Sequence, residues 1–343
     1  MSEPTTSALD VLDDSRILGF RKIFVKDPPL MEILTAISCL HRTGKGITHS
    51  QCMGLFGPSG SGKTRLVQYY KHGYLKTQPI STYELDGIEV TTFPILIVEC
   101  PAHATIKGLA ETLLTALGDP KPWRGSQQEM TQRVLYGLRL RRVSLIVLDE
   151  FQHLSNQVRS NYAAYETADW LKSLLNANIC PILLVGTEAA ASVLRVNEQL
   201  QRRSFAVHRF QPYSITNRTD FQIFKAMLEG LEKAMNLPLP SGLADENLAS
   251  RIHAATEGLI GRITGLLDRA LLLAIERKEN CITRQTLHDV YSRIFNVTDS
   301  GLNPFSAGDQ PEPSSHQGDI STRAIRARGN NNHAALRIKD LLG

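Results

Sequence analysis

Long apolar runs and paired cysteines are both missing from this sequence. Its apolar runs, such as Ser144–Leu148 and Pro181–Gly186, have the length of a strand and fall short of the roughly 18 residues of a membrane helix. The opening MSEPTTSALDVLDD lacks the basic start and apolar core of a signal peptide. The five cysteines are scattered without a CxxC pair, which argues against a disulfide framework or a zinc site. We therefore expect a cytoplasmic protein without a membrane partner.

The chain also has little net charge. The chain has 38 Lys and Arg against 34 Asp and Glu, a net charge of +4, which by itself does not indicate nucleic acid. Hydrophobic residues make up 42% and charged residues 21%, as in ordinary soluble domains, so wholesale disorder and a collagen-like rod are excluded. A length of 343 residues predicts about two domains.

Buried strands alternate with helical patterns in the first two thirds of the chain. Apolar runs of strand length occur at 51–56, 93–100, 143–148 and 180–185, and helical spacing of apolar residues separates them. This pattern predicts an α/β fold with a parallel sheet and helices on both of its faces. Residues 74–92 show no clear period and are either a hairpin-like excursion or a loop.

Helical patterns alone follow the last of these strands, so a small all-helical domain is expected after the sheet. The composition after Asp299 turns to Gly, Pro, Ser, Asn and Gln, which is typical of disorder, and apolar residues return near the end. The predicted boundaries are a flexible lead-in at 1–20, the α/β domain at 21–212, the helical domain at 213–298 and a disordered tail with a short partner-docking segment at 299–343.

GPSGSGKT is a complete phosphate-binding loop between a strand and a helix. Its glycines let the backbone N–H groups wrap around phosphates at the helix N-terminus. Lys63 is expected to reach the β- and γ-phosphates of ATP, and the Thr64 hydroxyl to bind Mg²⁺. The predicted nucleotide-binding residues here are Gly57, Pro58, Ser59, Gly60, Ser61, Gly62, Lys63, Thr64 and Arg65.

Two carboxylates end the strand of SLIVLDE. Asp149 is expected to hold the Mg²⁺ shell, together with Thr64, and Glu150 to polarise the attacking water. The alternative is that both carboxylates only cap the next helix. Thr187, which ends the strand of PILLVGT, either orients water near the γ-phosphate or is an ordinary helix cap.

Three arginines are further candidates. Arg202 and Arg203, at an edge of the α/β domain, could reach a neighbour's nucleotide as an arginine finger or could be a solvated basic pair. Arg262 opens a helix of the second domain and could fold onto the γ-phosphate or lie on the surface.

The order of these motifs resembles an AAA+ ATPase. LFGPSGSGKT, DEFQHL and PILLVGTEAA are more narrowly similar to the TniB/TnsC family of transposition regulators. The resemblance covers roughly residues 20–295 and implies an AAA+ sheet domain with a helical lid. It also implies Mg-dependent ATP hydrolysis, with Thr187 as first sensor, Arg203 or Arg202 as finger and Arg262 as second sensor.

The same resemblance implies the partners. ATP-bound subunits of such proteins assemble head to tail, as a ring or a filament, around double-stranded DNA, recruit and activate a DDE transposase and work with TniQ-like target-selection proteins. The expected location is therefore the bacterial nucleoid. DNA contacts would be made to phosphates without sequence specificity, and Lys107 and Arg124 are candidates for them or ordinary surface charges.

Other functions stay open at this point. A helicase loader or replication initiator would more often carry a winged helix or a helicase-docking segment. An ExeA-like ATPase scaffold without a DNA role would often carry a membrane segment or a cell-wall module. A small-molecule kinase is disfavoured, because the helical domain offers no evident substrate pocket.

Overall fold

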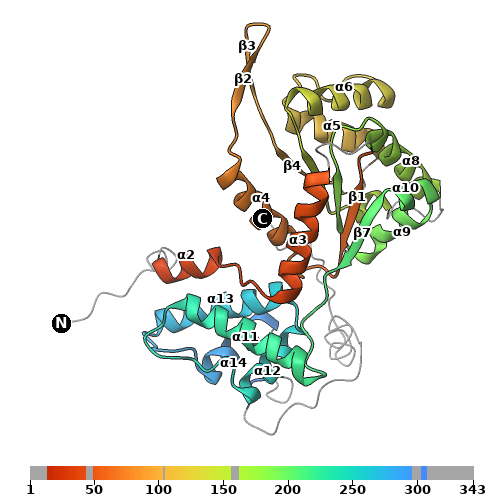
Figure 1. The fold of residues 1–343 in the computed structure, drawn as a ribbon. Coiled ribbons are helices and arrows are strands. Elements are labelled where there is room, and N and C mark those ends of the chain that lie inside the picture. Colours follow the sequence, from red (N-terminus) through yellow and green to blue (C-terminus); the bar gives the residue numbers. More distant parts are fainter. Residues whose placement is uncertain (1–13, 44–48, 103–104, 156–161, 296–302, 307–343) are drawn as a thin grey trace, which may run out of the picture.

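The computed structural model describes residues 14–43, 49–102, 105–155, 162–295 and 303–306. They form a sheet domain and a helical domain, which lies below the sheet in Figure 1. Among the described residues, no helix combines the length and apolarity that a bilayer crossing requires. The elements are α2 (Ser15–Lys22), α3 (Pro28–Thr43), β1 (Cys52–Phe56), α4 (Lys63–Thr77), β2 (Thr82–Leu85), β3 (Ile88–Thr91), β4 (Ile95–Glu99), α5 (Ile106–Leu117), α6 (Gln127–Leu140), β5 (Leu145–Asp149), α7 (Gln152–Ser155), α8 (Tyr162–Asn176), β6 (Ile182–Gly186), α9 (Ala191–Arg195), α10 (Glu198–Arg202), β7 (Ser204–Arg209), α11 (Arg218–Met235), α12 (Glu246–Thr256), α13 (Ile260–Glu276) and α14 (Arg284–Phe295).

The sheet is parallel, and its strand order is β4-β5-β6-β1-β7. The register places the last residues of the strands side by side: Phe56 pairs with Gly186 and Arg209, and Glu99 pairs with Asp149. In open parallel sheets ligands bind outside the carboxyl ends of the strands. The loops that follow β1, β5 and β6 therefore lie together at the carboxyl ends of the strands. This end of the sheet is called the carboxyl edge, and the opposite end, where the strands begin, the amino edge.

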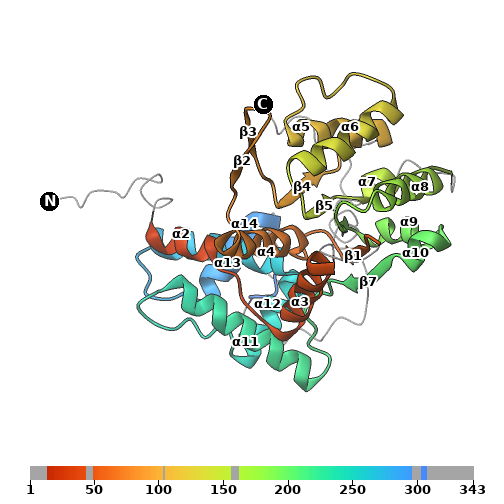
Figure 2. The ribbon, with the colours of Figure 1, turned by 45° about the horizontal axis from the view of Figure 1, so that its top comes forward.

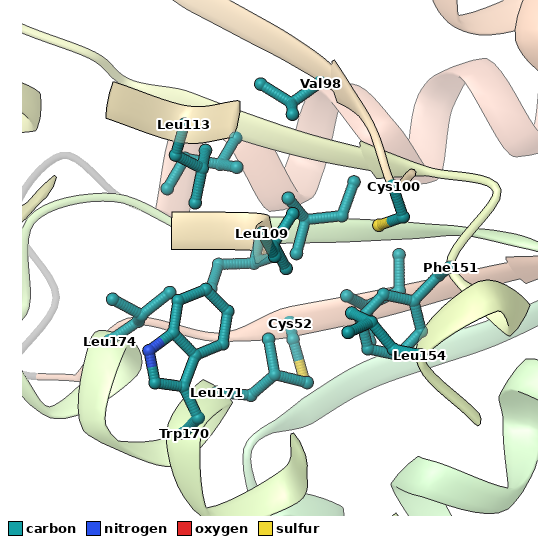
Figure 3. Close-up of a cluster of buried hydrophobic side chains, with 14 of the residues drawn as sticks. Cys52, Val98, Cys100, Leu109, Leu113, Phe151, Leu154, Trp170, Leu171 and Leu174 are labelled. Carbon is teal, nitrogen blue, oxygen red and sulfur yellow. The ribbon is translucent and has the colours of Figure 1, made fainter. Parts of the chain in front are cut away.

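Helices cover both faces of the sheet, as the continuous apolar runs predicted. One face packs against α5, α6 and α8, and Figure 3 shows part of that core, with Trp170 and Leu109 among its side chains. The other face packs Met53, Leu55 and Val147 against α3 and α4. Strands buried on both sides need apolar residues at every position, which is why their sequence shows no alternation. The predicted α/β class is confirmed.

Strands β2 and β3 form a hairpin that extends away from both domains (Figures 1 and 2). Asp86 and Gly87 make its turn with φ angles of 51° and 78°, the left-handed pair that a two-residue hairpin loop favours. The sequence was compatible with either a hairpin or a loop in this region, and the structure shows the hairpin.

The helical domain has its own core, built from α11, α12, α13 and α14. Helix α2 belongs to this core, because Ile17 and Phe20 are buried in it and Arg21 pairs with Asp268 at 2.8 Å. Phe305 is also buried there, and Arg251 donates a hydrogen bond of 2.6 Å to the Pro304 carbonyl. The structure thus differs from the predicted flexible lead-in at residues 15–20 and from the predicted disordered tail at residues 303–306. The predicted docking segment near the end of the tail lies outside the described residues.

Candidate nucleotide-binding and hydrolysis site

The phosphate-binding loop connects β1 to α4 at the carboxyl edge. Gly60 and Gly62 have φ angles of 75° and 95°, a conformation that costs glycine little and other residues much more. Gly57 has no space for a side chain, since a Cβ there would collide with the Phe210 carbonyl oxygen. The loop's glycines are therefore required by backbone shape, in agreement with the motif.

Lys63 is buried inside the loop. Its Nζ donates hydrogen bonds to the carbonyl oxygens of Gly57 at 2.9 Å and Pro58 at 2.7 Å and to the Ser61 Oγ at 3.3 Å. Burial lowers the pKa of Lys63, while the nearby carboxylates of Glu150 and Asp149 act in the opposite direction. The loop thus holds an ammonium group at the place where phosphates are expected.

The two predicted metal ligands meet, although 85 positions separate them in sequence. The Thr64 hydroxyl donates a hydrogen bond of 2.6 Å to Oδ2 of Asp149, a carboxylate with only 6% of its surface exposed. Magnesium prefers oxygen ligands and usually takes only one or two from protein carboxylates, so this pair fits the ion. The geometry requires β1 and β5 to end at the same edge, which the sheet order provides.

Glu150 and Thr187 lie on the next two loops of the carboxyl edge and are connected by a residue that the sequence analysis did not single out. Glu150 adopts a φ of 52°, and its N–H donates to Oδ1 of Asp149 at 2.9 Å. The side-chain amide of Gln152 donates to Oε2 of Glu150 and accepts from the Thr187 N–H at 3.0 Å. Gln152 was visible in sequence only as a letter of DEFQHL.

A small apolar cavity opens beside the loop. It lies between the segment before α3, the start of α4 and the helical domain, and its lining includes Phe24, Leu30, Phe210, Tyr213 and Ile260. Cavities of this composition suit a flat, largely apolar group such as a nucleobase. The N–H of Gly261 donates a hydrogen bond of 2.8 Å to the Gly60 carbonyl, so the helical domain touches the phosphate-binding loop directly.

The TniB family profile, "Bacterial TniB protein", matches residues 21–215, which is more than half of the chain. The chain belongs to the TniB family. No curated protein matches it.

Solved structures of the same fold include Cdc6p from Pyrobaculum aerophilum, with 17% identity and a TM-score of 0.59 over 83% of this chain and 73% of that chain. The Aeropyrum pernix ORC2 protein in ADPNP–ADP complexes has 16% identity and a TM-score of 0.56 over 82% and 72%. The Aeropyrum pernix ORC1 protein in complex with DNA has 19% identity and a TM-score of 0.54 over 83% and 68%. At these identities the likeness shows the fold alone. The family match, together with this fold, makes the chain a P-loop ATPase of the AAA+ class.

Arg65 and Arg262 make contacts other than those expected from sequence. The Arg65 guanidinium donates to the carbonyl oxygens of Arg21, at 2.7 Å, and Ile23, which lie at the end of α2. Arg262 pairs with Glu257 at 2.7 Å, and its neighbour Gly261 is the residue that contacts the loop. The roles of both arginines toward nucleotide stay predictions.

Arg202 and Arg203 lie at the opposite, amino edge of the sheet. The Arg203 carbonyl accepts a hydrogen bond of 2.9 Å from the N–H of Cys52, the first residue of β1, whereas the phosphate-binding loop follows the last. The guanidinium of Arg203 has one buried nitrogen, Nη1, without a hydrogen-bond partner among the described residues. Neither arginine is positioned to act on its own subunit's nucleotide.

The two predicted DNA contacts, Lys107 and Arg124, lie near the start of α5 and in the loop that follows its end. Lys107 is exposed in the first turn of α5, and Arg124 is exposed in the loop after that helix. The 12 residues of α5 rise about 18 Å along the helix axis. Their contacts with DNA stay predictions.

Proposed function

We propose that this TniB-family ATPase is an ATP-dependent, DNA-binding regulator of DNA transposition. In this proposal it assembles head to tail on target DNA, recruits and activates a DDE transposase, and limits the assembly by hydrolysis. The observation that carries the proposal is the meeting of Thr64 and Asp149 beside the buried Lys63 in a chain of the TniB family.

ATP binding follows from the loop and the cavity. The N–H groups at the start of α4 would hold the phosphates. The Lys63 ammonium would contact phosphate oxygens in place of the Gly57 and Pro58 carbonyls. The apolar cavity would take the base. Mg²⁺, held by Thr64 and Asp149, would neutralise charge that develops on the phosphates.

Hydrolysis needs a base for water and a cation for the leaving charge. Glu150, next to Asp149, would accept the proton of the attacking water, and Thr187 would orient that water or the γ-phosphate. Arg203 or Arg202 would complete the site of an adjacent subunit. Because the arginines and the phosphate-binding loop lie at opposite sheet edges, subunits that share sites in this way must stack head to tail.

DNA is the proposed scaffold of this assembly, and the Aeropyrum pernix ORC1 structure in complex with DNA supports a DNA role for the fold. A heterologous contact that does not close generates a helix, and a helix of subunits can follow a duplex. Contacts to phosphates through residues such as Lys107 and Arg124 would make binding salt-sensitive and independent of sequence. A DDE transposase and a TniQ-like protein are the proposed partners at the nucleoid.

Replication initiation or helicase loading is the second candidate function. The observation that favours it is the similarity of the fold to Cdc6p and the ORC proteins. Fold similarity at this identity does not carry the activity with it, and the family match favours transposition.

The proposal is tested by imaging purified protein with duplex DNA at low salt, with and without a non-hydrolysable ATP analogue, by negative-stain electron microscopy. Lys63→Ala removes the phosphate-binding charge, and Lys76→Ala removes an exposed charge from the far end of the same helix as a matched control. A DDE transposase encoded near this gene is then added, and its sedimentation with the complex is measured.

We expect rings or filaments on DNA only with the analogue, lost in Lys63→Ala and kept in Lys76→Ala, and co-sedimentation of the transposase. Tight nucleotide binding without any DNA-bound assembly would reject the proposal in favour of an ExeA-like scaffold. DNA-bound assemblies that retain a replicative helicase and no transposase would support the second candidate.

A further inference from the structure

Gln152 lies at the start of α7, immediately behind the carboxyl edge, with only 6% of its surface exposed. Its amide nitrogen donates to the Glu150 carboxylate, and its amide oxygen accepts from the backbone N–H of Thr187. We propose that Gln152 is a positioning residue for ATP hydrolysis, which holds the Glu150 carboxylate at a fixed place relative to the phosphate-binding loop. This inference rests on the proposed role of Glu150.

A run of hydrogen bonds connects the loop to Glu150 through Gln152. The Gly57 N–H donates to the Gly186 carbonyl at 3.1 Å, and the next residue, Thr187, donates its N–H to Gln152. Gln152 then donates to Glu150. Hydrogen bonds from the end of β6 thus fix the positions of both the phosphate-binding loop and, through Gln152, the Glu150 carboxylate.

Glu150 needs these hydrogen bonds because its own backbone leaves the side chain free to rotate. It follows the end of β5 in a left-handed conformation, and its carboxylate lies three torsions from the backbone. Displacing a catalytic group by about 1 Å from its productive position can lower the reaction rate by about a hundredfold. The backbone here is fixed, since the Phe151 N–H bonds to the Val185 carbonyl at 2.9 Å, so side-chain freedom is what Gln152 restricts.

The Gln152 amide supplies the acceptor and the donor that its two partners need. A backbone N–H must face an acceptor and a carboxylate must face a donor, so the two ends of the Gln152 amide cannot be exchanged. The end of β6 is shaped for this contact: a Cβ at Gly186 would lie 2.5 Å from the Gln152 amide oxygen. Glycine at 186 therefore makes room for the bridge.

The test compares three changes at position 152 in the full chain. Gln152→Met keeps the length and removes both hydrogen bonds, whereas Gln152→Glu keeps the acceptor for Thr187 and removes the donor to Glu150. Gln152→Asn is too short to span both partners. We expect kcat to fall about ten- to hundredfold in all three, with KM and the Kd of a non-hydrolysable ATP analogue within about twofold, because positioning acts on the transition state.

A readout independent of turnover is the Kd of ADP with aluminium fluoride, which mimics the transition state. It should weaken by about the same factor as kcat, while the Kd of ADP alone stays constant. Gly186→Ala should reproduce the loss by displacing the amide without changing it. His153→Ala, on the same short helix and half-buried, is the matched control and should match wild type.

The Glu150→Gln background separates this inference from the proposed function. If Glu150 is the base, Glu150→Gln is nearly inactive, and adding Gln152→Met causes no further loss, because both act through one group. Hydrolysis that survives in Glu150→Gln would reject the role of Glu150 itself. An inactive Glu150→Gln with a fully active Gln152→Met would reject only the positioning role. If Gln152→Met lowers kcat, the affinity for the ATP analogue and the thermal unfolding midpoint together, Gln152 has a purely structural role.

Discussion

Lys63 and Asp149 are opposite charges that the fold buries together, with 7% and 6% of their surfaces exposed. Burying a charge is costly unless hydrogen bonds replace water, and here each charge has such partners. Lys63 contacts three oxygens of its own loop, and Asp149 accepts from Thr64 and from the N–H of Glu150. Both charges are therefore held in place by hydrogen bonds with the protein itself, which offset the cost of their burial.

Asp149→Asn separates the charge of this residue from its shape. The amide oxygen can replace Oδ1 and accept from the Glu150 N–H, and the amide nitrogen can donate to the Thr64 hydroxyl, so the thermal unfolding midpoint should stay close to that of wild type. ATP hydrolysis at millimolar Mg²⁺ should fall by about a hundredfold, the scale expected for loss of one electrostatic group in a site. Glu99→Gln neutralises an exposed carboxylate on the neighbouring strand end and is the control for charge alone. A similar loss in both variants would contradict the assignment of Asp149.

Sequence predicted the residues whose chemistry restricts their type. Phosphate-binding glycines, a lysine and strand-end carboxylates are few enough in kind that spacing identifies Gly57–Thr64 and Asp149 without a structure. Gln152 escaped prediction because its role depends on two contacts, to a neighbour two positions back and to a backbone N–H 35 positions ahead. Nothing in the residue type of a glutamine indicates such a pair.

At the scale of elements, α2 illustrates a helix that sequence could not assign. It has eight residues and few apolar ones, and its burial depends on α11 and α13, more than 190 positions later in the chain. Local periodicity carries no information about partners so far away. The strands of the sheet were predictable for the opposite reason, because burial on both faces leaves a local apolar run.

Ile17→Ala tests whether α2 stabilises the helical domain. Ile17 is fully buried, so its truncation should lower the free energy of unfolding by about 2–5 kcal/mol, as for other buried aliphatic residues. Leu18→Ala on the same helix, at a position 42% exposed, should cost less than about 0.5 kcal/mol. Urea unfolding and hydrogen exchange at α11 give the comparison. Equal effects at both positions would mean that α2 is not docked in solution.

The start of α13 is the second element with a direct consequence for function. A Cβ at Gly261 would lie 2.5 Å from the Gly60 carbonyl oxygen, whereas one at Gly265 would meet nothing closer than 3.6 Å. Gly261→Ala should therefore push the helical domain away from the phosphate-binding loop and widen the apolar cavity, because the close packing at this contact leaves no space for a methyl group. Nucleotide binding should weaken by about tenfold or more.

Gly265→Ala is the matched control on the same helix. It should leave nucleotide affinity within about twofold and raise stability by about 0.5–1 kcal/mol, because alanine favours a helix interior over glycine. Titration with a fluorescent nucleotide and a thermal melt measure both effects. Unchanged affinity in Gly261→Ala would show that the contact between the helical domain and the loop does not serve binding.

At the scale of the whole molecule, the candidate residues are divided between the two edges of the sheet. The carboxyl edge holds Lys63, Asp149 and Glu150, and the amino edge holds Arg202 and Arg203. Sequence placed these arginines near an edge of the domain but could not say which one, because that depends on the register of β7 against β1. With the register known, only an adjacent subunit can bring such an arginine to a nucleotide.

This separation makes a prediction about mixtures of variants. Glu150→Gln retains its arginines and its phosphate-binding loop but lacks the proposed base, and the double variant Arg202→Ala/Arg203→Ala retains that base but has no arginine to offer. Each alone should hydrolyse ATP at background rate on DNA. In an equal mixture, head-to-tail contacts place an intact Glu150 against an intact arginine at about one junction in four, so about a quarter of the wild-type rate should return. The single variants Arg202→Ala and Arg203→Ala, each mixed with Glu150→Gln, then identify which arginine acts. A mixture no faster than the sum of its components would mean that the arginines do not complete a neighbour's site, and the head-to-tail assembly would lose its structural basis.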